Sequence, residues 1–157
     1  MPGLLSRFIK SSALRANREH LTEKPPRRQT MEKLVILGVL LNRVAYADEK
    51  ISEEEETCIK KILRARGAAP DEAAMVIASA REAADKRPDI QGFTREVNRK
   101  PYEERIRVVE LLFEVALADS NLAPIELAAV RQIADLLWIA HKDFIEAKLR
   151  VKNALKL

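Results

Sequence analysis

Residues 40–63 read LLNRVAYADEKISEEEETCIKKIL, and residues 111–134 read LLFEVALADSNLAPIELAAVRQIA. The two stretches align without a gap from end to end, and eight of the 24 paired positions are identical. Six identical pairs are apolar, which is common in a helix-rich chain. The two informative pairs carry carboxylates: Asp48 with Asp119, and Glu55 with Glu126. The alignment predicts two copies of a helix–acidic loop–helix unit, a pseudo-twofold repeat rather than a solenoid of three or more units.

The rest of the chain has the same helical character. Only four glycines occur, and residues with high helix propensity are abundant. Residues 31–48 and 106–118 are apolar almost all round, which places them at the centre of a bundle. Helices are expected over residues 31–48, 52–66, 70–86, 93–99, 101–119, 124–139 and 142–152. No apolar stretch alternates as a strand does, so we expect an all-α helical bundle of about six to seven helices.

Composition narrows the classes of protein to which the chain can belong. A length of 157 residues with 47% apolar side chains suits one globular domain. The single cysteine, Cys58, excludes an intrachain disulfide and favours a reducing compartment such as the cytoplasm. The longest apolar run has eight residues, whereas a membrane span needs about 20. The first residues also lack the features of a secretory signal.

Positive charge is concentrated at the N-terminus. The net charge is +4, and residues 1–33 hold eight Lys and Arg against three Glu. The remainder is close to neutral, so we expect no nucleic acid partner. Residues 2–21 can form a basic amphipathic helix that contacts an anionic membrane peripherally, packs on the bundle, or remains a tail. Pro25 and Pro26 end this segment, so we expect an arm and linker over 1–28 and a helical domain over 29–157.

The loop carboxylates are candidate ligands for a hard cation such as calcium. The candidate metal ligands are Asp48, Glu55, Asp119 and Glu126. When Glu55 is placed last in a calcium-binding EF-hand loop, Val44 and Tyr46 fall at ligand positions that they cannot serve. A tight EF-hand site is therefore excluded, and a weak site completed by water stays open. The alternative is a purely structural capping box, in which Ser52 and Glu55 satisfy each other's backbone N–H groups at a helix start.

Nothing in the sequence favours catalysis. The chain has no His-Cys cluster, no zinc-protease spacing and no glycine-rich phosphate loop. Cys58 is predicted to be a packed small hydrophobe, and Trp138 is predicted to join a core stripe of Val130, Ile133, Ala134 and Leu137. The paired carboxylates are the one remaining acid–base candidate. We therefore predict a protein that is not an enzyme, with no catalytic and no cofactor-binding residues.

Two segments resemble the signature of a known family. VAYADEKIS at residues 44–52 and VALADSNL at residues 115–122 are similar to the TerB-like proteins, which include tellurite-resistance proteins of the TerB type and the N-terminal domain of the co-chaperone DjlA. Residues 92–95, 97–99 and 141–145 resemble a short stand-alone bacterial subgroup. The likeness covers roughly residues 30–152.

The resemblance implies an all-α bundle, a cytoplasmic location and no known catalysis. It also implies a link to tellurite or general stress response and metal association through the four loop acids. Family members often have glycine after the loop aspartate, where this chain has Glu49 and Ser120. Two hypotheses follow: an interaction or scaffold module that binds other proteins at or near a membrane, and a weak divalent-cation sensor.

Overall fold

The computed structural model describes residues 27–87 and 89–157. The chain divides into two compact parts, residues 1–30 and residues 31–157. The larger part contains nearly all the described residues and both acidic loops. The predicted amphipathic segment over 2–21 lies outside the described residues, so its membrane contact and the domain boundary after residue 28 stay predictions.

The described residues form seven helices and no strand, which confirms the predicted all-α fold. The helices are α2 (Arg27–Ala45), α3 (Glu53–Ala65), α4 (Pro70–Lys86), α5 (Gln91–Val97), α6 (Tyr102–Ala116), α7 (Pro124–Leu136) and α8 (His141–Ala154). The first begins four residues before its predicted start. The predicted helices over 31–48 and 101–119 extended too far, because the chain turns directly after an alanine in each case, at Ala45 and Ala116.

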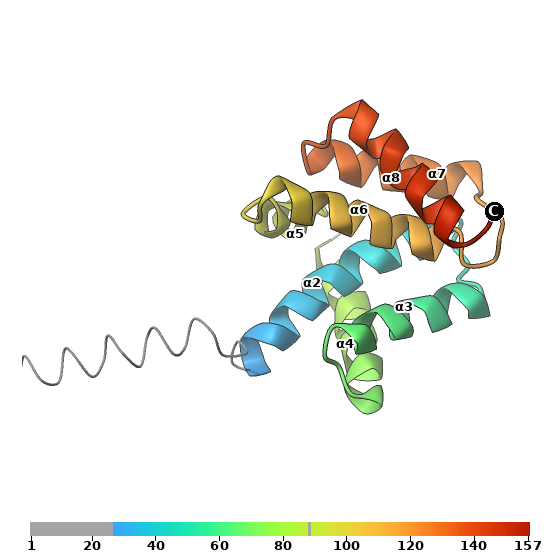
Figure 1. Cartoon of the computed structure of the whole chain (residues 1–157). Coiled ribbons are helices and arrows are strands. Elements are labelled where there is room, and N and C mark those ends of the chain that lie inside the picture. Colours follow the sequence, from blue (N-terminus) through green and yellow to red (C-terminus); the bar gives the residue numbers. More distant parts are fainter. Residues whose placement is uncertain (1–26, 88) are drawn as a thin grey trace, which may run out of the picture. The chain divides into compact units, whose positions relative to one another are not determined.

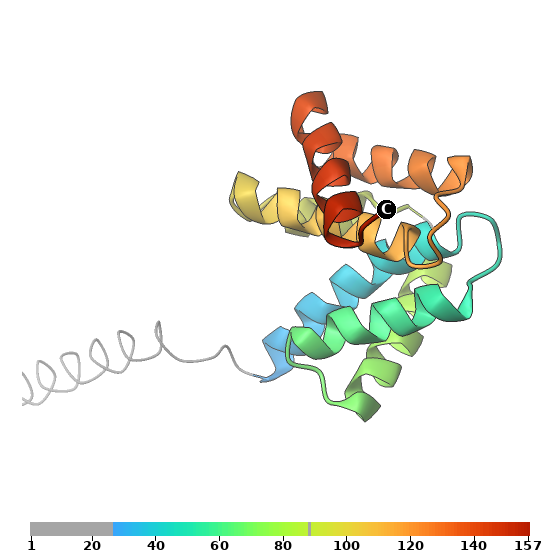
Figure 2. The same ribbon diagram turned by 45° about the vertical axis from the view of Figure 1, so that its right-hand side comes forward.

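Two central helices divide the bundle. Figures 1 and 2 show α2 and α6 crossing in the middle, with α3 and α4 on one side and α7 and α8 on the other. α5 lies beside the start of α6 (Figure 1). The strongest association joins α6 to α8, and α3 packs on both α4 and α6.

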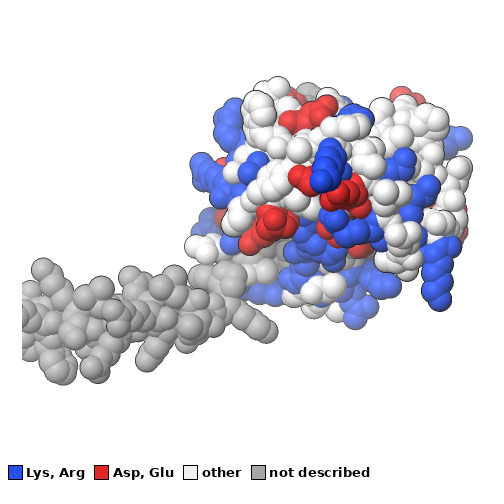
Figure 3. All heavy atoms as spheres, turned by 45° about the horizontal axis from the view of Figure 1, so that its top comes forward, with Lys and Arg blue, Asp and Glu red and all other residues white. Residues whose placement is uncertain are grey.

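The surface carries mixed charge. On the face that Figure 3 displays, Lys and Arg side chains alternate with Asp and Glu. Among the described residues, Arg107 pairs with Glu110 at 3.1 Å and Lys86 pairs with Glu82 at 2.8 Å. Ion pairs of this exposed kind contribute little to stability.

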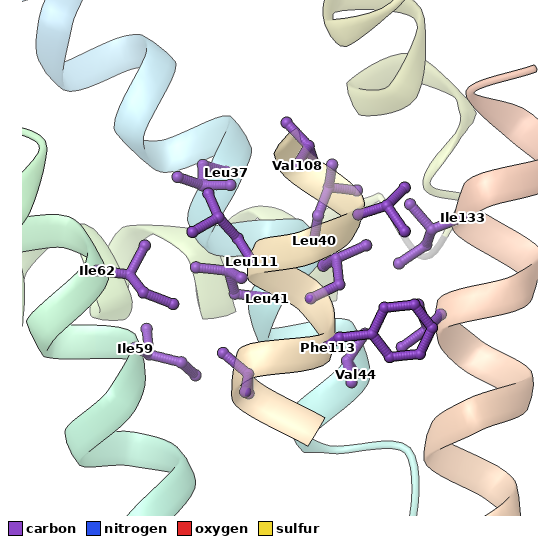
Figure 4. Packing of buried hydrophobic residues seen from close by; sticks show 14 of the residues in the cluster. Leu37, Leu40, Leu41, Val44, Ile59, Ile62, Val108, Leu111, Phe113 and Ile133 are labelled. Atoms are coloured by element: carbon purple, nitrogen blue, oxygen red, sulfur yellow. The ribbon is translucent and has the colours of Figure 1, made fainter. Parts of the chain in front are cut away.

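The core lies between the central helices and their neighbours. Figure 4 shows Leu40 and Leu41 from α2 and Phe113 from α6 in one cluster of buried side chains. Ile59 from α3 and Ile133 from α7 lie on opposite sides of this cluster. All five side chains are fully buried. Burial of one such side chain contributes about 1.5–3 kcal/mol, so the two apolar helices hold the bundle together.

The prediction that Trp138 belongs to the core is wrong. The stripe of Val130, Ile133, Ala134 and Leu137 is buried as expected, but Trp138 is 76% exposed. α7 ends at Leu136, and Trp138 takes a left-handed backbone conformation with φ 58° just beyond the cap. The turn, closed by the Ile139 N–H donating to the Ala134 carbonyl, directs the indole outward instead of continuing the helical stripe.

No helix among residues 27–87 and 89–157 has the length and apolar character needed to cross a membrane.

Candidate functional site

Both acidic loops close in the same way. After α2, the Lys50 N–H donates to Asp48 Oδ1 at 3.2 Å. After α6, the Asn121 N–H donates to Asp119 Oδ1 at 3.0 Å. Each aspartate thus holds its own turn through an Asx contact. Asp48 and Asp119 remain exposed, and the other oxygen of each carboxylate faces no hydrogen-bond donor among the described residues.

The residue after each aspartate has an unusual backbone. Glu49 has φ 66° and Ser120 has φ 64°. This left-handed region favours glycine, and a residue with a Cβ occupies it at a cost of about 1 kcal/mol. Both loops therefore have a backbone geometry that favours glycine, although neither position is glycine.

The two glutamates occupy equivalent places at helix starts. Glu55 is the third residue of α3 and Glu126 is the third residue of α7. The Glu55 N–H donates to the Ser52 hydroxyl at 3.1 Å, which confirms the predicted Ser52 cap. The equivalent cap residue of α7, Ala123, has no side-chain acceptor.

Burial sets these glutamates apart from the other acids of the surface. Glu55 and Glu126 are each only 3% exposed. One carboxylate oxygen of each, Oε2, is buried without a hydrogen-bond partner. A buried carboxylate that lacks partners is costly when charged. A proton, an ordered water or a cation at that oxygen would lower the cost.

The pKa of Glu126 reflects this cost. Burial is the largest cause of its rise to about 7, the charges of Glu55, Asp119 and Asp48 act in the same direction, and the Ala123 backbone opposes the rise. Burial also raises the pKa of Glu55, against the lowering effect of Ser52. Asp119 and Asp48 contribute to the rise for Glu55 as well. The fold thus brings the other three predicted carboxylates close enough to raise the pKa of Glu126, whose carboxyl titrates near neutral pH.

The side chains do not form a ready metal cage. In the part of the chain that the structure describes, no group of three or more His, Cys, Asp and Glu side chains is arranged to hold a metal ion. The donors are all hard oxygens, which calcium and magnesium prefer, but they are too few for a tight calcium shell.

The comparison with known proteins identifies the family. The family model for tellurite resistance protein TerB matches residues 35–149, which is most of the chain. The chain belongs to the TerB family. The match includes both acidic loops and all four carboxylates, in agreement with the resemblance seen in the sequence. No curated protein and no solved structure gave a significant match.

Two larger grooves lie on this TerB-family body. The first, of about 1130 Å³, lies between α3, α6 and α8 and includes Cys58. Burial raises the pKa of the Cys58 thiol to about 11, with help from the nearby Glu114 charge. The thiol is therefore protonated and unreactive at neutral pH, consistent with the predicted packing role.

The second groove was missed by the sequence reasoning. It has a volume of about 810 Å³ and lies between α2, α4 and α7. Asn42, which is 4% exposed, lies in its wall, and neither polar atom of its side chain has a hydrogen-bond partner. One signal was available: Asn42 is polar within an otherwise apolar helix, at the position where the second unit has Phe113.

Proposed function

We propose that this TerB-family protein is a non-enzymatic interaction module whose paired acidic loops bind a divalent cation such as calcium weakly. We place it in the cytoplasm, in tellurite resistance or a general stress response, with other proteins as partners. The observation that carries the cation proposal is the pair of buried carboxylates, Glu55 and Glu126, each with one oxygen that lacks a partner.

The two units are, in this proposal, a pseudo-twofold repeat. α3 and α7 are equally long, and each begins and ends at paired positions of the alignment. Backbone hydrogen bonds also recur at paired positions: Tyr46 to Asn42 and Leu117 to Phe113, Ala47 to Val44 and Ala118 to Val115, Glu49 to Tyr46 and Ser120 to Leu117. The equivalence supports a site to which both loops contribute.

A cation would act by replacing the proton of the buried pair. Like charges on Glu55 and Glu126 oppose each other in a poorly solvated place. A divalent cation neutralises both charges, while the negative charges of Asp48 and Asp119 attract it and water completes its coordination shell. Binding then links the start of α3 to the start of α7, so that cation concentration controls the stiffness of the interface between the units.

The enzyme alternative has less support. A carboxyl with a pKa of about 7 has the acidity of a general acid or base. A catalyst also needs a cavity in which a substrate reaches that group. Neither Glu55 nor Glu126 lines the two grooves described above. The pair is better suited to holding a small ion than to organic chemistry.

Calcium titration followed by calorimetry tests the proposal. We expect a saturating heat for the wild-type chain at pH 7.5 and its loss in the Glu55→Gln, Glu126→Gln double variant. The Asp48→Asn, Asp119→Asn variant should bind more weakly. The matched control is Glu54→Gln with Glu103→Gln, which removes two exposed helix-start acids and should leave the heat unchanged. A wild-type heat no larger than that of dilution would reject the cation role.

The predicted membrane contact needs its own experiment. We propose that residues 2–21 contact anionic membranes peripherally, on the basis of their basic amphipathic pattern. Co-sedimentation with phosphatidylglycerol vesicles should retain the full chain and lose it when residues 1–26 are deleted. Equal retention on neutral phosphatidylcholine vesicles would contradict a charge-driven contact.

A further inference from the structure

The wall of the α2–α4–α7 groove contains a buried polar side chain, Asn42, that core packing alone does not explain. Asn42 is 4% exposed, and both its Nδ2 and its Oδ1 lack hydrogen-bond partners. A buried polar group without a partner costs free energy that an apolar side chain avoids. Phe113, its counterpart on α6 in the second unit, is fully buried and packs against Phe144 with ring centroids 5.2 Å apart. The amide at position 42 therefore serves something other than core packing.

A second unpartnered donor lines the same groove. The Nε of Arg81 is buried and has no acceptor. The Arg81 guanidinium lies over the Tyr46 ring at 5.3 Å, and one of its terminal nitrogens is 3.8 Å from Glu56. Both contacts involve the outer part of the guanidinium and leave Nε unsatisfied. The two donor groups, Arg81 Nε–H and the Asn42 amide, and the one acceptor, Asn42 Oδ1, thus lie just beneath the surface of the groove, so an occupant reaches them when the side chains that cover them move aside.

The charge and the shape of the groove restrict the chemical class of ligand that it can bind. The lining holds three cations, Arg43, Arg81 and Arg87, and two acids, Glu49 and Asp85. Since Arg81 also lies 3.8 Å from Glu56, a negatively charged group is attracted chiefly to Arg43 and Arg87. The opposite wall is apolar. It includes Ile125, a large hydrophobic side chain that is 50% exposed, and the small residues Ala128 and Ala129. An occupant that covers this wall needs a short apolar side chain next to its carboxylate.

We propose that this groove binds the C-terminal carboxylate of a peptide whose last residue is apolar. The carboxylate accepts from Arg81 Nε–H and from the Asn42 amide, and the N–H of the last peptide bond donates to Asn42 Oδ1. The apolar side chain covers Ile125 and the neighbouring alanines. The site deepens the interaction role proposed above and rests on it, but it uses none of the four loop carboxylates.

The probe is N-acetyl-alanyl-leucine, compared with its C-terminal carboxamide, titrated into the ¹⁵N-labelled full chain. A calcium chelator is present throughout, so the outcome is independent of the cation experiment. We expect the free acid to shift the Asn42 side-chain amide and the backbone amides of Arg43 and Ala128 saturably. The carboxamide should bind at least tenfold more weakly. Asn42→Leu and Arg43→Gln should each weaken the free acid at least tenfold, whereas Lys61→Gln, a cation of the other groove, should not.

Three results would overturn the site. The first is the absence of a saturable shift with the free acid, as expected if ordered water alone satisfies Asn42. The second is equal binding of acid and carboxamide. The third is an equal response to inorganic phosphate, which would indicate general anion binding. The spectrum of Asn42→Leu without ligand establishes that the variant is folded, because dispersed core resonances do not depend on the ligand.

Discussion

The charge of Glu55 raises the pKa of Glu126, its counterpart in the second unit, which holds the same third place in its own helix. Both side chains are buried at the starts of helices whose positive dipole ends attract negative charge. The effect of burial on the pKa is larger than the effect of the helix dipole, because the pKa of each carboxyl is raised. The carboxyl of Glu126, with its pKa of about 7, is therefore the group on which the proposed exchange of a proton for a cation depends.

Stability should fall as pH rises through neutrality. The folded Glu126 has a pKa of about 7 against 4.5 for an ordinary glutamate. The folded state binds the extra proton, so the stabilisation is complete below pH 4.5 and is lost as pH rises through 7. At about 1.4 kcal/mol per pKa unit, the loss between pH 5 and pH 8 reaches at most about 3 kcal/mol. Urea unfolding at both pH values measures it.

Glu126→Gln provides the control for this pH dependence. The amide keeps the shape and carries no charge, so the variant should be more stable than wild type at pH 8 and similar at pH 5. Glu55→Gln should move the wild-type transition to lower pH, because it removes a charge that raises the pKa of Glu126. Parallel pH profiles for wild type and Glu126→Gln would show that this carboxyl does not titrate near neutrality.

Calcium binding should release protons. If the cation replaces the proton on the buried pair, affinity should rise with pH between 6 and 8 and level off above pH 8. Calorimetry at pH 7 in buffers of different ionisation enthalpy measures the number of protons released. We expect up to one proton for each calcium ion. Heats that do not depend on the buffer would place the cation elsewhere on the protein.

Glycine at the two left-handed loop positions should stabilise the fold. Glu49→Gly and Ser120→Gly remove a Cβ where φ is 66° and 64°. The relief of strain outweighs the greater freedom of glycine in the unfolded chain, for a net gain of about 0.5–1 kcal/mol each. Thermal unfolding measures the gain. Ala128→Gly, in an exposed part of α7, should instead lose about 1 kcal/mol.

Ala123→Ser should supply the cap that α7 lacks. Ser52 caps α3 through its hydroxyl, whereas Ala123 has the same extended backbone and no acceptor. A serine there can accept from the Glu126 N–H and should add about 0.5–1 kcal/mol. Ser52→Ala should cost about 1 kcal/mol. Opposite signs for the two variants would support the equivalence of the units, and a loss for both would argue against it.

Asn42→Leu should raise stability while it removes peptide binding. The leucine has a similar volume and leaves no polar atom unpaired, so the gain should be about 1–2 kcal/mol. Chemical unfolding of the variant measures it. A loss of stability would show that Asn42 has a structural partner in solution, such as a water molecule.

Much of the fold was predictable because local chemistry and long-range packing agree. Prolines at 70 and 124 start helices as their fixed backbone angle favours, and Ser52 caps its helix as predicted. The two apolar stretches became the central helices because no surface position tolerates so many large hydrophobic side chains. Pattern alone also placed the four loop acids at matching positions.

The sequence could not predict how deeply each acid is buried. Glu55 looks like its neighbours Glu53 and Glu54, which are exposed, and only its place at the third helical position turns it inward. The α2–α4–α7 groove was likewise not predictable from the sequence. Asn42 and Arg81 belong to different helices, and the packing of α4 against α2 that brings both into one wall leaves no local signature.

The outward indole at the α7–α8 turn has a practical consequence for spectroscopy. Trp138 is the one tryptophan of the chain and is already largely hydrated in the folded state. Its emission should be red-shifted and readily quenched by acrylamide before any denaturant is added. Tryptophan fluorescence will thus report poorly on unfolding of the core. It will respond directly to any molecule that binds over the α7–α8 turn.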